Sequence, residues 1–272
     1  MPRIALLATL LAVGPVAAQE AAGRIGLAAA FGGEGKPIAS GLTWRVYADR
    51  LDGGPMTEVA RSDEAAPRFR LQPGAYVVNA TYGFASASKK VVVGTEEANE
   101  RLTISAGALQ LAGAIGETPI PGPRLAFSVF VPVGRNSEGR LVRGGVKAGD
   151  LVRLPEGTYH VVSTYGDSNA IMRADLKVES GRLTQATLNH RAATVTLKLV
   201  AAPGAEAFAG TAFSVLTPGG DTIREAIGAF PSVTLAEGDY VLIARHDGDV
   251  FTQEFKVESG RDRDIEVLAK AK

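Results

Sequence analysis

In three stretches of the chain, every second residue is of a kind suited to a protein core. This period of two is typical of half-buried β-strands. The stretches cover residues 76–82, 159–165 and 240–246. Each of these rows has four members: the first and last carry a ring, and the third is small. The rows are Tyr76, Val78, Ala80, Tyr82, then Tyr159, Val161, Ser163, Tyr165, then Tyr240, Leu242, Ala244, His246. We predict that each row faces a protein core.

A second row with the same period lies upstream of each of these stretches. Its members are Trp44, Val46, Ala48, then Phe127, Val129, Val131, then Phe213, Val215, Thr217. A small residue in one row opposite a large ring in the other is the volume compensation that close packing requires. No window shows convincing helical periodicity, so the pattern predicts strands throughout.

Both rows belong to a unit that occurs three times. The motif Leu-x-x-Gly-x-Tyr ends at Tyr76, Tyr159 and Tyr240, at intervals of roughly 80 residues. The five residues 178–182, Val-Glu-Ser-Gly-Arg, recur without change at 257–261. The sequence therefore predicts three homologous modules, which we place at residues 21–106, 107–190 and 191–272.

Turn signals separate the strands within each unit. The chain reads Tyr-Gly at 82–83, Tyr-Gly-Asp at 165–167 and His-Asp-Gly-Asp at 246–249, each between two strand patterns, as in hairpins. About seven short strands in each unit indicate an all-β fold of three tandem Ig-like or prealbumin-like antiparallel β-sandwich modules, with the choice of topology open. The joints between units are short, so we expect an elongated, semi-rigid array.

The first eighteen residues have the pattern of a signal peptide. Arg3 precedes an uncharged apolar run at 4–13, Gly14 and Pro15 interrupt it, and small residues lead to Ala18. The run is too short to span a bilayer, which takes about 20 residues. We predict cleavage after Ala18 and a periplasmic or secreted protein without membrane insertion; an uncleaved anchor is the alternative.

Composition and charge narrow the partners. The chain has 29 basic and 29 acidic residues, so no net charge steers it toward nucleic acid or anionic lipid. The 32 glycines and 14 prolines are too few for a low-complexity chain. No cysteine is present, so an exported form depends on packing for its stability. We expect another periplasmic or envelope protein as partner, with a glycan as the weaker alternative.

The aromatic residues are predicted to be structural. Tyr76, Tyr159 and Tyr240 each lie two residues after a glycine at a strand start, the position of a tyrosine corner, whose ring is in the core and whose hydroxyl bonds to backbone. Trp44 could belong to a carbohydrate platform, but phenylalanines occupy its place in the other two units. We therefore expect Trp44 in the core.

No catalytic, cofactor-binding or metal-binding motif is found. The glycine-rich segment 31–37 lacks the first glycine and the hydroxyl residue of a phosphate loop, and we predict a loop between the first two strands. His160, His190 and His246 lie in separate strand contexts without ligand spacing. Neither a Gly-x-Ser-x-Gly elbow nor a His-Glu-x-x-His helix occurs, so we expect no enzyme, no cofactor and no metal.

One local asymmetry points to a partner contact. The second unit carries Arg135, Arg140 and Arg143 in a glycine-rich stretch at 134–144. Arginine suits bidentate contact with a carboxylate or a phosphate. We take these three arginines as the candidate contact residues, with a solvated hairpin loop as the alternative.

The motif Leu-Pro-x-Gly-x-Tyr, followed by strand residues and a Tyr-Gly turn, resembles bacterial extracytoplasmic β-sandwich repeats of the carboxypeptidase-regulatory-like (prealbumin-like) and PEGA type. Such repeats serve as spacers or contact surfaces beside other domains, and the metal motif Asp-x-Ser-x-Ser of one such companion domain is missing here. The resemblance implies a non-enzymatic exported spacer or protein-interaction scaffold. A glycan- or peptidoglycan-binding module and an accessory subunit of an exported enzyme are the alternatives.

Overall fold

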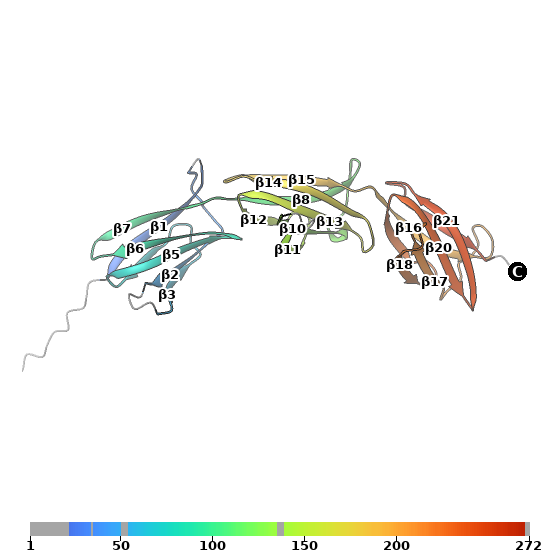
Figure 1. The fold of residues 1–272 in the computed structure, drawn as a ribbon, viewed down its shortest axis with the longest axis horizontal. Coiled ribbons are helices and arrows are strands. Elements are labelled where there is room, and N and C mark those ends of the chain that lie inside the picture. The colour runs from blue at the N-terminus through green and yellow to red at the C-terminus, as the bar shows by residue number, and fades with distance from the viewer. Residues whose placement is uncertain (1–21, 34, 50–53, 135–138, 270–272) are drawn as a thin grey trace, which may run out of the picture.

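The computed structural model describes residues 22–33, 35–49, 54–134 and 139–269. The predicted signal peptide at 1–18 and Arg135 lie outside these ranges. The described residues form three β-sandwiches that follow one another in a gently curved row (Figure 1). Apart from one 3₁₀ turn, η1 (Gly122–Arg124), the regular structure of the described ranges consists of strands, which confirms the all-β class.

The first module packs a three-stranded sheet, ordered β4-β1-β7, on a four-stranded sheet, ordered β3-β2-β5-β6. Its strands are β1 (Gly23–Phe31), β2 (Leu42–Ala48), β3 (Thr57–Ser62), β4 (Arg68–Leu71), β5 (Gly74–Tyr82), β6 (Ala85–Val93) and β7 (Glu97–Ile104). The predicted loop at 31–37 starts at Phe31, the last residue of β1, and its other described residues lie between β1 and β2.

The second module repeats this plan, with the sheets β12-β8-β15 and β11-β10-β13-β14 and a short β9 beside β8. Its strands are β8 (Ala106–Ile115), β9 (Thr118–Pro119), β10 (Leu125–Val131), β11 (Arg140–Val146), β12 (Leu151–Pro155), β13 (Gly157–Tyr165), β14 (Ile171–Val178) and β15 (Leu183–Asn189).

The third module has the sheets β19-β16-β22 and β18-β17-β20-β21. Its strands are β16 (Ala192–Val200), β17 (Ala212–Leu216), β18 (Thr222–Ile227), β19 (Ser232–Ala236), β20 (Gly238–His246), β21 (Asp249–Val257) and β22 (Arg263–Leu268). The same strand order in all three modules bears out the repeat that the motif spacing indicates.

Each module encloses its own cluster of buried side chains. The clusters extend from Ile25 to Ala106, from Leu109 to Ala192 and from Ala193 to Val267. The rings of Trp44, Phe127 and Phe213 are at most 1% exposed. Their cross-strand partners are the small residues Ala80, Ser163 and Ala244, which confirms the expected volume compensation.

One strand pair in each module departs from the expected antiparallel pattern. The first and last strands run parallel: β1 with β7, β8 with β15 and β16 with β22. Parallel neighbours start at the same end of a sheet. The chain therefore enters a module at one end and leaves at the other, which allows the next module to follow in line (Figure 1).

Candidate functional site

Successive modules meet at two junctions, each made of a short link and a docked hairpin. Only Ser105 separates β7 from β8, and only His190 and Arg191 separate β15 from β16. Links this short bring the β5–β6 hairpin against β12, and the β13–β14 hairpin against β19. We call the contact between the first two modules the first junction and that between the last two the second junction.

At the first junction, Arg153 of β12 covers the hairpin of the preceding module. Its guanidinium carbon lies 5.1 Å from the centre of the Tyr82 ring, within the range of a cation–π contact. The Phe84 N–H donates to the Arg153 carbonyl at 3.1 Å. A Cβ on Gly83 would lie 2.5 Å from the Cβ of Arg153, so only glycine fits there.

At the second junction the arginine comes from the other side. Arg124 of the second module lies 4.7 Å from the centre of the Tyr165 ring of its own module. Its Nη2 donates to Thr194 Oγ1 and Thr234 Oγ1 of the third module, both at 2.8 Å. A Cβ on Gly166 would lie 2.7 Å from the Cβ of Thr234.

The two junctions place a guanidinium over the hairpin tyrosine from opposite modules. Arg153 and Thr234 hold the same register position, since their cross-strand partners Ala108 and Thr194 are also equivalent. At the first junction, a Cβ on Gly41 would lie 2.7 Å from the guanidinium carbon of Arg153. Gly41 corresponds to Arg124, because each directly precedes the strand that pairs with the tyrosine hairpin. A guanidinium thus fills the space over the tyrosine at both junctions.

Polar contacts join the second and third modules further. Asn169 donates through Nδ2 to the Tyr240 hydroxyl at 2.9 Å and accepts the Ala236 N–H at 3.0 Å. Ser168 Oγ donates to the Thr234 carbonyl. An ion pair of 2.5 Å joins Asp167 to Arg224 of β18.

The verbatim repeat Val-Glu-Ser-Gly-Arg forms a turn that rests on the preceding module. Gly181 lies against the Phe31 ring, and Gly260 against Ile115; in each case a Cβ would be 3.4 Å from the nearest atom. Both glycines have a positive φ, +72° and +74°, which glycine adopts without strain. The first module, which follows no described module, has the sequence Gly-Thr-Glu after β6 in place of this motif.

Other residues of this motif hold the turn together. Arg182 pairs with Glu179 at 3.1 Å, and Arg261 pairs with Glu258 at 2.6 Å. Sequence comparison within the chain finds the repeat but not its role, since the residues it touches lie far away in the sequence.

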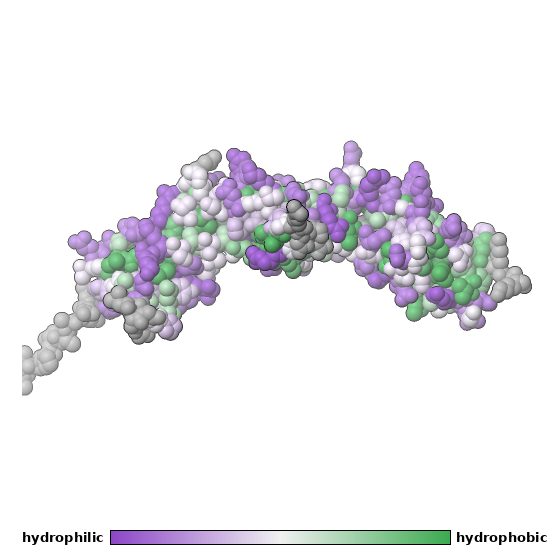
Figure 2. Space-filling model, in the orientation of Figure 1, coloured by the Kyte–Doolittle hydropathy of each residue, from purple (hydrophilic) through white to green (hydrophobic). Residues whose placement is uncertain are grey.

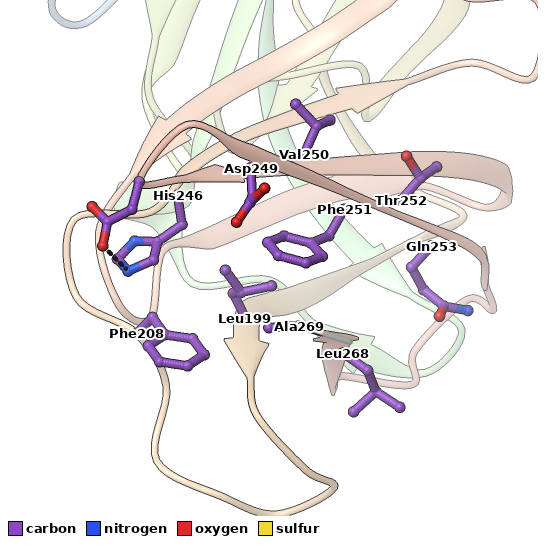
Figure 3. Close-up of a pocket in the computed structure, with 11 residues that line it drawn as sticks. Leu199, Phe208, His246, Asp249, Val250, Phe251, Thr252, Gln253, Leu268 and Ala269 are labelled. Carbon is purple, nitrogen blue, oxygen red and sulfur yellow. Dashed lines mark ion pairs between the residues drawn. The ribbon is translucent and has the colours of Figure 1, made fainter. Parts of the chain in front are cut away.

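A hollow of about 690 Å³ lies at the far end of the third module (Figure 3). Phe208 and His246 stack there with ring centres 5.1 Å apart, and Leu199 and Phe251 form further walls. Figure 2 shows apolar residues gathered at this end on the visible face. Asp247 occupies the turn position of Gly83 and Gly166, so this end does not offer the glycine that both junctions need.

The predicted aromatic roles are confirmed. The hydroxyls of Tyr76, Tyr159 and Tyr240 donate to the carbonyls of Gln72, Pro155 and Ala236, four residues upstream, at 2.7 to 2.8 Å. Burial raises the pKa of Tyr159 and of Tyr240. These hydroxyls therefore form the corner hydrogen bonds within their own modules.

The structure places two of the three candidate contact arginines on one strand. Arg140 and Arg143 both lie exposed on β11, an edge strand of its sheet. Arg143 lines a groove at the first junction together with Phe84 and Arg153, whereas Arg140 does not. The contact role of the three arginines stays a prediction.

Sequence reasoning missed one buried polar pair. Ser163 Oγ lies 2.8 Å from Nε2 of His190, and both residues are at most 3% exposed. Burial lowers the pKa of His190, and a hydrogen bond to the Ala170 backbone opposes this in part. The only signal is that Ser163 replaces the alanine of the other two modules.

Two features are absent from the described ranges. No group of three or more histidine, aspartate or glutamate residues in them could hold a metal ion. In these same ranges, no helix has the length and apolar character needed to cross a membrane.

The family described as the Rhizobiales growth-associated tandem repeat domain matches residues 194–269, most of the third module. This match supports a tandem repeat and does not bear on the carboxypeptidase-regulatory-like or PEGA type. No curated protein sequence is significantly similar to the chain.

Among solved structures, the chain is similar to the Bacillus anthracis TIE protein, with 17% identity, a TM-score of 0.27 and coverage of 93% of this chain and 51% of that one. It thus spans about half of that protein. The major pilin subunit BcpA of Bacillus cereus follows with 11% identity, a TM-score of 0.26 and coverage of 91% and 99%. The shaft pilin spaA of Lactobacillus rhamnosus GG has 11% identity, a TM-score of 0.32 and coverage of 62% and 97%.

Proposed function

We propose that the protein is a non-enzymatic, exported spacer and protein-interaction scaffold, in which three β-sandwiches hold a fixed line. The observation that carries this proposal is the pair of junctions. Each combines a guanidinium over a tyrosine ring with a glycine that leaves no room for a side chain. Flexible linkers would need none of these contacts, because their modules move independently.

Export is part of the proposal and is supported by the sequence at 1–18. It places the mature chain in the periplasm or outside the cell, with another envelope protein as its partner. Sequencing the N-terminus of protein recovered from the periplasm and the medium tests this. A mature chain that starts at Gln19 is expected, and an unprocessed chain retained in the cytoplasm would contradict export.

The spacer role predicts a narrow distribution of distances across each junction. The chain has no cysteine, so pairs of spin labels can be attached without background. A variant with cysteines in place of the exposed Ser86 and Lys147 reports the distance across the first junction. A variant with cysteines in place of Lys147 and Lys256 reports the distance across the second. Pulsed dipolar spectroscopy should give one narrow peak for each pair. Broad distributions, with a solution scattering profile of separate beads, would refute a rigid spacer.

A glycan-binding role would need aromatic rings other than Trp44 and the corner tyrosines. Trp44 and the corner tyrosines are at most 8% exposed, whereas sugar-binding faces depend on exposed rings. Sedimentation of the protein with purified cell wall tests this alternative directly. Retention at high salt would favour the glycan role over the scaffold.

A further inference from the structure

A groove of about 250 Å³ lies across the first junction, and one of its lining residues comes from the edge strand β11. We call it the junction groove. It takes residues from the hairpin of the first module and from two strands of the second, and these include Phe84, Arg143, Asp150, Leu151 and Arg153.

The junction groove contains two guanidinium groups without a carboxylate partner among the described residues. Arg143 is exposed on β11, where none of the described carboxylates forms an ion pair with it. Arg153 stacks on Tyr82, and its buried Nε–H has no hydrogen-bond acceptor. Among the described residues that line the groove, the acid is Asp150, which accepts the Lys147 N–H at 3.1 Å. A buried donor without an acceptor is costly, so the groove offers an unfilled place for an acceptor group.

At the second junction an equivalent arginine is paired with a carboxylate. Arg143 and Arg224 are equivalent, because each pairs with the second residue of the inward row on the neighbouring strand, Val129 and Val215. Arg224 forms an ion pair with Asp167 of the preceding module, at 2.5 Å. Phe84 takes the place of Asp167, the second residue after the hairpin tyrosine. The carboxylate that the chain supplies at one junction is therefore missing at the other.

Apolar surface replaces the missing acid. The side chains of Phe84 and Leu151 border the groove, and both are 46% exposed. Exposed apolar groups beside arginines are typical of protein contact sites, where aromatic residues and arginine are enriched.

We propose that the junction groove binds an acidic segment of a partner protein, which places a carboxylate between Arg143 and Arg153 and an apolar side chain on Phe84 and Leu151. This inference rests on the proposed scaffold function and names the chemistry of its partner. Since the groove is built from two modules, the segment binds only to a chain whose first junction is formed. The second junction does not compete, because Asp167 already occupies its arginine.

The probes are fluorescein-labelled octapeptides with two glutamates and one phenylalanine or leucine in every relative spacing, each matched by a twin with glutamine in place of glutamate. Fluorescence anisotropy with the full chain at low salt should identify glutamate peptides that bind more tightly than their twins. Added salt should weaken this binding, since exposed charges are screened.

Two variants place the binding in the groove. Arg143→Gln should weaken the selected peptides about tenfold, the usual scale for loss of one charge-assisted contact. Phe84→Asp should weaken them at least as much, because the new carboxylate occupies Arg143 as Asp167 occupies Arg224. The matched control is Arg61→Gln, which removes an exposed arginine from β3, the equivalent strand of the first module, and should leave binding unchanged.

Several results would overturn the inference. No preference for the glutamate peptides would do so, as would equal weakening by Arg61→Gln, which indicates general charge attraction. Binding of a DNA duplex or of anionic vesicles that requires Arg143, without peptide binding, would assign the groove to another class of ligand. Spin-label distances measured on Arg143→Gln separate the two proposals: a rigid rod that binds no acidic peptide keeps the spacer and removes only the groove.

Discussion

Arg153 and Tyr82 belong to different modules, yet the guanidinium carbon of one lies 5.1 Å from the ring centre of the other. The corresponding tyrosine of the second module, Tyr165, receives Arg124 from within its own module at 4.7 Å. The repeat thus keeps the contact and changes the residue that supplies it. At the first junction this contact itself crosses between modules, whereas at the second the guanidinium crosses through its bonds to Thr194 and Thr234.

The closeness of Gly83 to the next module predicts a steric effect of a single methyl group. In Gly83→Ala the new Cβ meets Arg153 at 2.5 Å, so the first junction must open or strain. We expect a loss of about 1–3 kcal/mol beyond the backbone cost of placing alanine at a positive φ. Trp44, the single tryptophan, lies in the first core, and its fluorescence in a urea titration reports the stability of that module.

Gly33→Ala is the matched control for that experiment. Gly33 lies in the first module at φ +75°, close to the +62° of Gly83, but nothing lies within 4 Å of its added Cβ. Both variants carry the backbone cost, and only Gly83→Ala has the steric conflict. Equal destabilisation of the two would show that the junction adds nothing to the stability of the first module.

We predict that Arg124 stiffens the second junction. Arg124→Gln removes the cation over Tyr165 and the two 2.8 Å bonds to Thr194 and Thr234. The spin-label distance distribution between Lys147→Cys and Lys256→Cys should broaden, while that of the first junction should not change. The Trp44 unfolding curve serves as an internal control, because the contacts of Arg124 given above lie in the second and third modules. An unchanged width would mean that Asn169 and Asp167 hold the junction without it.

Much of each sandwich could be predicted because its determinants are local in the sequence. Strand alternation, a glycine before the corner tyrosine and a Gly-containing hairpin recur within each unit, and they specify the inward rows that Trp44, Phe127 and Phe213 occupy. The parallel pairing of first and last strands could not be predicted in this way. It depends on which end of the sandwich the chain leaves, a long-range choice that periodicity does not encode.

The junctions were predicted least well, again for a physical reason. Val-Glu-Ser-Gly-Arg is visible as a repeat, but its contacts, Phe31 and Ile115, lie in the preceding module. Arg143 could be singled out by composition, yet its groove depends on Phe84, far away along the chain. Residues that meet only when two modules dock leave no periodic pattern in either one.

The tyrosine corners predict a graded set of stability losses. Tyr76→Phe and Tyr159→Phe each remove one hydroxyl bond to a backbone carbonyl, for an expected loss of about 1 kcal/mol. Tyr240→Phe removes its corner bond and also the acceptor of Asn169 across the second junction. It should therefore cost more, and calorimetry of the three variants measures the order. If Tyr240→Phe in an Asn169→Ala background costs as much as in the parent, the hydroxyl does not couple the modules.

The buried pair Ser163–His190 predicts a pH dependence centred on the second module. Because burial holds the folded pKa of His190 below its ordinary value of 6.5, the unfolded chain takes up a proton first as the pH falls. The stabilising contribution is complete above about pH 6.5 and decreases below it, with a slope of at most ~1.4 kcal/mol per pH unit. Unfolding free energies measured from pH 7.5 to 5.5 should decrease accordingly.

His190→Gln identifies the group responsible. The variant keeps a polar side chain near Ser163 but cannot titrate, so it should be less stable at pH 7.5 and show a shallower slope toward pH 5.5. The other two histidines are the same in both proteins, and their effects cancel in the comparison. Parallel slopes for the variant and the parent would mean that the pH dependence arises elsewhere, since a buried neutral imidazole cannot be removed without changing the proton balance of unfolding.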